Sequence, residues 1–158
     1  MRLLVCGSRY WSSDAECLRV EREIRALAPA VVIHGGAHGV DHLADLAARL
    51  VGYTRAVFVA DWHAHGKGAG PRRNERMLRD GKPTRGLAFG PLWKRETGPF
   101  PPLFAAVSDV KESWRRTGTG DMVSRLLDAG IGVRWVPVVG AFAVELAEMP
   151  PPPNGGAS

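Results

Sequence analysis

The sequence predicts an α/β protein of the Rossmann-like, doubly wound type, with a mainly parallel five-stranded sheet and helices on both faces. Two observations predict it. Short, almost wholly apolar runs alternate along the chain with segments of helical periodicity, and strands that are apolar on both sides are typical of a parallel sheet buried between helices. Because crossovers between parallel strands are right-handed, this alternation winds the sheet in both directions.

The first half of the chain contains two strands and two helices in alternation. Residues 2–6 form an apolar run that ends at a glycine, which indicates a buried strand. Residues 14–27 carry apolar side chains on one helical face, with a serine and an aspartate available as N-caps and a proline just after the end. The apolar run at 30–34 predicts the second strand, and the periodic segment at 42–51, closed by a glycine, predicts the second helix.

The same alternation continues in the second half. Residues 55–60, RAVFVA, are apolar after the arginine and include two valines, which predicts the third strand. Residues 73–81 form the third expected helix, with a proline near the start and a glycine at the end. The apolar run at 85–90 predicts the fourth strand. A fourth helix is expected at 121–130 and a fifth strand at 132–139.

Three segments do not fit the alternation. Residues 91–116 contain four prolines and four large aromatic residues and exceed the length of an ordinary connection, so we expect an insertion with a short helix near 103–115. Residues 141–148 are expected to form a last short helix. The proline- and glycine-rich residues 150–158 predict a disordered tail. We therefore expect a single domain over residues 1–149.

The composition excludes several classes of protein. No apolar run approaches the roughly 18 residues that a membrane span needs, and the apolar stretch at the start is too short for a secretory signal. Cys6 and Cys17 are the two cysteines and lack a CxxC spacing, so neither a disulfide framework nor a thiolate zinc site is indicated. We expect a cytoplasmic protein with no membrane partner.

The charge is basic, with a formal net charge of +5 from 21 basic and 16 acidic residues, and 17 of the basic residues are arginine. Arginine binds phosphate through two parallel hydrogen bonds, so the bias favours phosphorylated partners. A GC-rich coding sequence explains the same bias equally well. The basic residues are scattered, which argues against a dedicated nucleic-acid surface.

Four polar or glycine-rich segments follow the predicted strands, where ligands bind in open α/β sheets. They are CGSRYW at 6–11, HGGAHGVD at 34–41, ADWHAHGKGAGPRRN at 60–74 and TGTGD at 117–121. Two are glycine turns that open onto helices and expose backbone N–H groups to an anion. Neither turn has the GxGxxG or Walker spacing, so no dinucleotide cofactor or Walker-type triphosphate site is supported. The expected ligand contacts are Gly7, Ser8, Arg9, Gly35, Gly36, Gly39, Asp41, Asn74, Gly118, Thr119 and Gly120.

In combination, these segments resemble the YspA-like branch of the SLOG superfamily, which includes the DNA-binding factor DprA/Smf and the LOG phosphoribohydrolases. The motifs that carry the resemblance are the GGAxGxD turn at 35–41 and the GPxRNxxM segment at 70–77. The resemblance extends over about residues 1–137, outside the insertion. It implies a Rossmann-like fold and a nucleotide or nucleotide-derived ligand, and LOG-like relatives imply a homodimer or larger assembly.

The LOG enzymes within this superfamily hydrolyse the N-glycosidic bond of a nucleoside monophosphate, using an arginine and a glutamate. The resemblance places Arg73 at the position of that arginine, and Gly118 and Thr119 at the GT pair of the motif that carries the glutamate. The glutamate position falls on Met122, one residue after Asp121, and the preceding Pro-Gly-Gly is absent. These departures favour binding without turnover. If hydrolysis occurs, Asp121 or Glu75 would supply the carboxylate and Arg73 would place the phosphate.

Each candidate also has a purely structural interpretation. Asp41 suits a ribose hydroxyl or a helix cap, and Asp121 suits an oxocarbenium-stabilising role or a cap. Arg73, Asn74 and Glu75 could equally be polar residues in the first turn of a helix. Ser8 and Arg9 suit either a phosphate site or a polar turn.

A metal site would need histidines from two separate pairs together with a carboxylate. The pairs are His38 with His42 and His63 with His65, and we expect no metal and no cofactor. Trp11 and Trp62 could stack on a base or pack against the core.

Three functions remain open. The first is a nucleotide-binding sensor or processing enzyme. The second is a DprA-like nucleic-acid-binding module, which the basic isoelectric point near 9.8 allows. The third is an interaction module whose aromatic insertion at 91–116 docks a partner.

Overall fold

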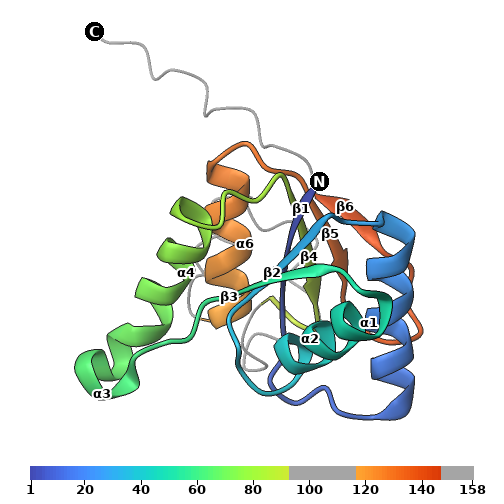
Figure 1. The fold of residues 1–158 in the computed structure, drawn as a ribbon, viewed down its shortest axis with the longest axis horizontal. Coiled ribbons are helices and arrows are strands. Elements are labelled where there is room, and N and C mark those ends of the chain that lie inside the picture. The colour runs from blue at the N-terminus through green and yellow to red at the C-terminus, as the bar shows by residue number, and fades with distance from the viewer. Residues whose placement is uncertain (93–116, 147–158) are drawn as a thin grey trace, which may run out of the picture.

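The protein is an α/β fold in which a mixed, mostly parallel sheet of six strands lies between two layers of helices (Figure 1). A computed structural model describes residues 1–92 and 117–146. The strands are β1 (Arg2–Gly7), β2 (Val31–His34), β3 (Thr54–Val57), β4 (Arg85–Phe89), β5 (Val133–Val136) and β6 (Val144–Leu146). The helical elements are α1 (Asp14–Leu27), α2 (Val40–Val51), α3 (Trp62–His65), the 3₁₀ turn η1 (Gly66–Gly68), α4 (Ala69–Arg79) and α6 (Gly118–Asp128).

The two faces of the sheet bury separate apolar cores. Alternate residues of β1 point to opposite sides, so that Leu3 and Val5 pack beneath α1 and α2 while Leu4 packs beneath α4 and α6. All three leucine and valine side chains are fully buried. This arrangement confirms the predicted α/β class with helices on both faces, and explains why the central strands are apolar throughout.

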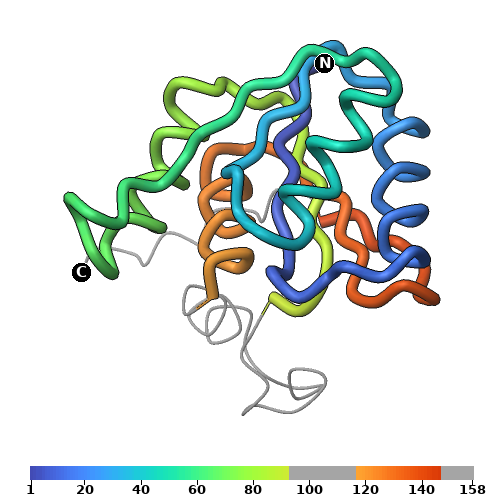
Figure 2. The backbone as a smooth tube through the Cα atoms, turned by 60° about the horizontal axis from the view of Figure 1, so that its bottom comes forward, coloured from blue at the N-terminus to red at the C-terminus, as the bar shows by residue number. Residues whose placement is uncertain are grey.

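The strands lie in the order β3-β2-β1-β4-β5-β6. The chain proceeds from β1 outward to β2 and β3, then returns to β4 on the other side of β1 and continues outward to β5. Between β1 and β4 the direction of winding reverses, and the loops that leave these two strands diverge there. Open α/β sheets bind their ligands at this kind of switch point, beyond the carboxyl ends of the strands. The loop after β1, the end of β4 and the start of α6 lie at that same end of the sheet (Figure 2).

One predicted element is wrong in the described part of the chain. Residues 144–146, expected within a last short helix at 141–148, form β6, which pairs antiparallel with β5. Val144 and Leu146 alternate with Glu145, whose carboxylate forms ion pairs with Arg134 and Arg85. Pairing with the open edge of β5 satisfies backbone groups that a helix of eight residues would leave free. The sheet therefore has six strands rather than five.

The helices that border the switch point begin earlier than predicted. Helix α6 starts at Gly118 rather than residue 121, because the Thr117 side chain accepts a hydrogen bond from the backbone of Gly120 at 2.9 Å and caps the helix. Helix α4 starts at Ala69 rather than residue 73. The expected short helix near 103–115 and the expected tail at 150–158 lie outside the described residues. Among the helices that are described, none combines the length and the apolar character needed to cross a membrane.

Candidate functional site

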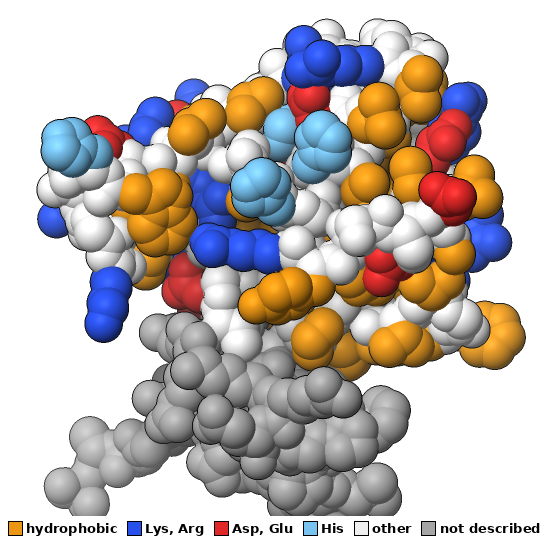
Figure 3. All heavy atoms as spheres, turned by 90° about the horizontal axis from the view of Figure 1, so that it is seen from below, with side chains coloured by type: hydrophobic (Ala, Val, Ile, Leu, Met, Phe, Trp, Pro, Cys, Tyr) orange, Lys and Arg blue, Asp and Glu red, His pale blue; other side chains and the backbone are white. Residues whose placement is uncertain are grey.

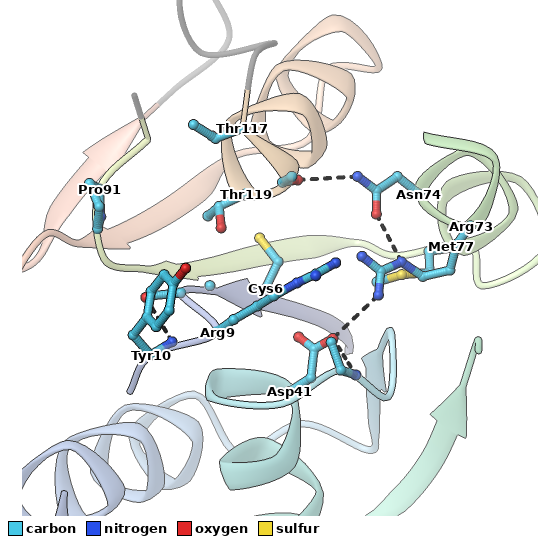
Figure 4. A pocket seen from close by; sticks show the side chains of 14 residues that line it. Cys6, Arg9, Tyr10, Asp41, Arg73, Asn74, Met77, Pro91, Thr117 and Thr119 are labelled. Carbon is cyan, nitrogen blue, oxygen red and sulfur yellow. Dashed lines mark hydrogen bonds and ion pairs between the residues drawn. The ribbon is translucent and has the colours of Figure 1, made fainter. Parts of the chain in front are cut away.

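A cavity of about 270 Å³ opens at the switch point, between the loop after β1, the turn before α2, helix α4 and the start of α6 (Figure 4). Eight of the predicted site residues line it: Gly7, Ser8, Arg9, Asp41, Arg73, Asn74, Gly118 and Thr119. They come from segments more than a hundred residues apart. The sheet topology has brought together the side chains expected to meet at its carboxyl edge.

The start of α6 forms one wall of the cavity. The Thr117 hydroxyl accepts from the Gly120 N–H and donates to the Leu92 carbonyl at 2.8 Å, which ties the helix start to the segment after β4. No residue in the described part of the chain accepts a hydrogen bond from the N–H of Gly118 or Thr119. Both residues line the cavity. The wall therefore offers backbone donors at the positive end of a helix dipole.

Arg73 reaches across the cavity from α4 to the turn before α2. Its Nη1 donates to the Gly35 carbonyl at 3.1 Å and lies 3.6 Å from the Asp41 carboxylate, while Nε donates to the Asn74 side chain at 3.1 Å. A β-carbon on Gly35 would lie 2.0 Å from Nη1, so glycine leaves the space that the guanidinium occupies. No described residue accepts from Nη2. Arg73 is thus held by protein contacts on one side only.

Asn74 joins α4 to α6. Its side chain is buried, its Nδ2 donates to the Gly118 carbonyl at 3.1 Å and to the Asp121 carboxylate at 2.9 Å, and its Oδ1 accepts from Arg73. These contacts use both ends of the amide. We infer that Asn74 positions Arg73 and the start of α6 relative to each other.

Asp41 organises the HGGAHGVD turn. Its Oδ2 accepts hydrogen bonds from the N–H groups of Gly35, at 3.1 Å, and Ala37, at 3.2 Å. Burial raises the pKa of Asp41 above its ordinary value, against the opposing effects of the Arg73 guanidinium and the two N–H groups. Two backbone donors of this turn are consequently occupied by a side chain of the protein itself.

Two glycines of this turn, Gly36 and Gly39, adopt positive φ, and Gly39 also leaves room for a neighbouring loop. Gly39 has φ of +76°, and a β-carbon there would lie 2.2 Å from the Ser8 carbonyl oxygen. The next residue, Val40, donates its N–H to that same carbonyl at 3.1 Å. Gly39 therefore lets the loop after β1 pack directly on the start of α2, which sets the width of the cavity. Gly36 also has a positive φ, of +65°.

The remaining predicted residues lie beside the cavity or away from it. Gly35, Gly36, Gly39 and Gly120 shape its walls without lining it. Asp121 lines an adjoining hollow, and its carboxylate accepts from Asn74 and pairs with Arg125 at 2.9 Å. Glu75 lines a separate hollow among Arg72, Arg76 and Arg79, and this hollow shares Arg73 with the cavity.

Several lining residues were not predicted: Cys6, Tyr10, Ala37, Met77, Pro91 and Thr117. Of these, Thr117 had a usable signal, because a threonine directly before a glycine-rich helix start is a typical N-cap. Burial raises the pKa of the Cys6 thiol, which places a neutral group at the floor of the cavity. Tyr10 lies on the rim and is almost fully exposed. The apolar floor and aromatic rim depend on the packing of three elements, which no local pattern in the sequence reports.

Viewed from the carboxyl edge of the sheet, Lys and Arg side chains lie around the periphery of the described surface and also near its middle (Figure 3). In the close-up, Arg9 and Arg73 extend into the same space from opposite sides (Figure 4). Two guanidinium groups that converge on one cavity favour an anionic occupant. No group of three or more His, Cys, Asp or Glu residues in the described ranges is placed to hold a metal.

His34, the last residue of β2 before this turn, makes stability depend on pH. It is 2% exposed; its Nδ1 accepts from the Gly36 N–H at 3.3 Å, so Nε2–H donates to Asp45 at 3.1 Å. Burial lowers the pKa of His34, against the opposing effects of Asp41 and Asp45. The unfolded chain therefore binds the proton more readily, and the stability that neutral His34 confers is complete above about pH 6.5.

We expect the free energy of unfolding to fall as the pH drops from 7.5 to 5.5, with a slope from this group of at most about 1.4 kcal/mol per pH unit. Urea denaturation at several pH values measures it. His34→Asn keeps an acceptor near the Gly36 N–H and cannot take up a proton, so its slope should be flatter. An equal slope in both proteins would contradict the assignment.

Comparison with known proteins adds family information. A family model described as the YspA, cpYpsA-related SLOG family matches residues 1–65. The Gene 61 protein of Mycobacterium phage D29 is 41% identical over 90 residues, which cover 51% of this chain and 70% of that protein. No solved structure matches the chain. The segment that the family model matches, residues 1–65, contains the loop after β1 and the whole HGGAHGVD turn, whereas α4 and α6 lie beyond it.

Proposed function

This chain belongs to the YspA, cpYpsA-related SLOG family through residues 1–65, and from this premise we propose that it binds a nucleotide or nucleotide-derived ligand in the switch-point cavity. Family membership suggests a nucleotide-related ligand in general terms. Different parts of the cavity suit the phosphate, the sugar and the base of such a ligand.

The phosphate is assigned to the wall formed by α6. The N–H groups of Gly118 and Thr119 are available there, and Arg9 and Arg73 supply positive charge from the facing walls. Backbone donors at a helix start together with arginines are the usual elements of a phosphate site. This convergence is the single observation that carries the proposal.

The sugar and base are assigned to the rest of the cavity. Asp41 uses Oδ2 for the turn, and no described residue donates to its Oδ1, which leaves an acceptor for a sugar hydroxyl. Tyr10 and Pro91 lie together on the rim, where the exposed aromatic ring suits a base (Figure 4). The phosphate would then lie deepest and the base nearest to solvent.

The test removes one backbone donor and leaves the fold intact. Gly118 is the first residue of α6, a position where proline is well tolerated, and the preceding Thr117 already has the extended conformation that proline requires. Gly118→Pro deletes the N–H that faces the cavity. Gly118→Ala keeps it and adds a β-carbon in open space.

We expect nucleoside phosphates to raise the melting temperature of the natural protein and of Gly118→Ala. Gly118→Pro should bind about 10- to 100-fold more weakly, because a hydrogen bond to a charged group contributes roughly 1.5–3 kcal/mol. Thermal-shift titration with mono-, di- and triphosphates of adenosine and guanosine measures this. Absence of any shift would refute nucleotide binding, and a response to single-stranded DNA alone would favour the nucleic-acid-binding alternative.

A second candidate function is hydrolysis of the N-glycosidic bond of the bound nucleotide. The observation that favours it is Asp41, a buried carboxylate at the cavity wall whose pKa is raised, a combination typical of acid–base residues. Of the carboxylates predicted for this role, Asp121 already accepts from Asn74 and Arg125, and Glu75 lies in a separate hollow. Chromatography for released base, with Asp41→Asn as the control, distinguishes turnover from binding alone.

A further inference from the structure

The switch-point cavity continues into a second hollow of about 260 Å³ on the side of α3 and α4. The two hollows share Arg9, Arg73, Asn74, Thr117 and Gly118. The shared residues include both guanidinium groups that converge on the proposed phosphate position. A ligand held at this junction therefore has space on two sides, whereas a single phosphate would fill only the junction itself.

The second hollow is lined by positive charge without free negative charge. Lys67 lies exposed on η1 at its margin, and Arg9 and Arg73 form its boundary with the first hollow. The one carboxylate that lines it, Asp121, is paired with Arg125 at 2.9 Å and bonded to Asn74. The first turn of α4 also lines it and contains no acidic residue. Arg9 and Lys67 thus face this space without an ion-pair partner among the described residues, Arg73 is shared with Asp41 at 3.6 Å, and the carboxylate of Asp121 is already neutralised.

Trp62 holds one of these cations in place. The Arg9 guanidinium carbon lies 5.4 Å from the centroid of the Trp62 ring, a cation–π contact between the loop after β1 and α3. This contact occupies the ring with a guanidinium, so a base does not have free access to that face. It also keeps Arg9 at the junction of the two hollows, where it can reach an anion in either of them.

We propose that the second hollow takes a second phosphoryl group, so that the ligand is a nucleoside diphosphate or a diphosphate ester rather than a monophosphate. This inference rests on the proposed function, since it assigns the first phosphate to the start of α6. The second phosphate would lie between Lys67 and the Arg9–Arg73 pair. Lys67 would act as the residue that distinguishes diphosphates from monophosphates.

Isothermal titration calorimetry on the full chain tests this, using the mono- and diphosphates of adenosine and guanosine without divalent metal. We expect the diphosphate of the preferred base to bind about tenfold more tightly than its monophosphate, because a charge-assisted contact is gained. Lys67→Met should remove most of that preference and leave monophosphate affinity within about twofold. Lys82→Met is the matched control, since Lys82 is also an exposed lysine and lies after α4, outside both hollows.

Trp62→Leu gives a second, independent readout. Without the ring, Arg9 loses its support at the junction, and diphosphate affinity should fall more than monophosphate affinity. Equal affinity for the two nucleotides, or a preference that survives both Lys67→Met and Trp62→Leu, would overturn this inference and leave the proposed function standing. Absence of binding by every nucleotide would overturn both together.

Discussion

Arg73→Met should lower the free energy of unfolding by about 3 kcal/mol at neutral pH, because it leaves the Asp41 carboxylate buried without its cation. The Asp41 and Arg73 side chains are 8% and 11% exposed, so water compensates little for the lost charge. The variant also loses the hydrogen bonds from Arg73 to Gly35 and Asn74. Urea denaturation followed by circular dichroism measures the change. Arg72→Met, an exposed position on the same helix, should change stability by less than about 0.5 kcal/mol.

The destabilisation by Arg73→Met should depend on pH. Burial raises the pKa of Asp41 and Arg73 is the largest influence that lowers it, so removing the guanidinium raises the pKa further. A carboxyl group whose pKa is higher in the folded state binds its proton more tightly there than in the unfolded chain. The stability that the protonated group confers is therefore complete below its ordinary pKa near 4 and is lost as the pH rises.

The deficit relative to the natural protein should therefore be larger at pH 7.5 than at pH 5. His34 titrates in both proteins, so its contribution largely cancels in the difference. The double variant Arg73→Met/Asp41→Asn should recover part of the stability that Arg73→Met loses at pH 7.5. Equal deficits at the two pH values would show that Arg73 contributes through packing rather than through charge.

The second large effect is expected for Gly39→Ala, which should cost about 3 kcal/mol or more. Alanine would have to adopt φ of +76° and would place its β-carbon 2.2 Å from the Ser8 carbonyl oxygen. The backbone strain costs about 1–3 kcal/mol. The collision adds to this because the contacted atom belongs to the backbone and cannot rotate away. Separation of the two loops would also widen the cavity, so nucleotide binding should weaken.

Gly52→Ala separates strain from collision. Gly52 follows α2 with φ of +86°, and a β-carbon there meets nothing within 4 Å. Alanine at this position should therefore cost only the backbone strain, about 1–2 kcal/mol, and should leave nucleotide affinity unchanged. Equal destabilisation by the two substitutions in urea denaturation would mean that the Ser8–Gly39 contact relaxes without penalty.

The amino-acid pattern by itself determined the class of fold and the edge of the sheet where the site lies. The apolar runs of β1, β2 and β4 are too short for helices and have no polar face, so they indicate buried parallel strands. Helix α1 was predicted with both of its ends, since its capping serine and terminating residues are local signals. Parallel strands then bring their carboxyl ends to one edge, which is why Ser8, Asp41, Arg73 and Thr119 could be expected near each other.

Tertiary structure alone decided the elements and contacts that depend on distant partners. The last residues of the described chain form β6 because the edge of β5 was open, and no local pattern reports an open edge. Gly35 is required by the guanidinium of Arg73, which comes from another helix, and Gly39 by the backbone of Ser8. Asp121 and Glu75 are equally plausible carboxylates in the sequence, yet packing of α4 on α6 places Asp121 beside the cavity and Glu75 in a separate hollow. Periodicity and capping are properties of neighbouring residues in the sequence. The pairing of β6, the need for Gly35 and Gly39, and the positions of Asp121 and Glu75 depend instead on which surfaces meet when the helices pack on the sheet.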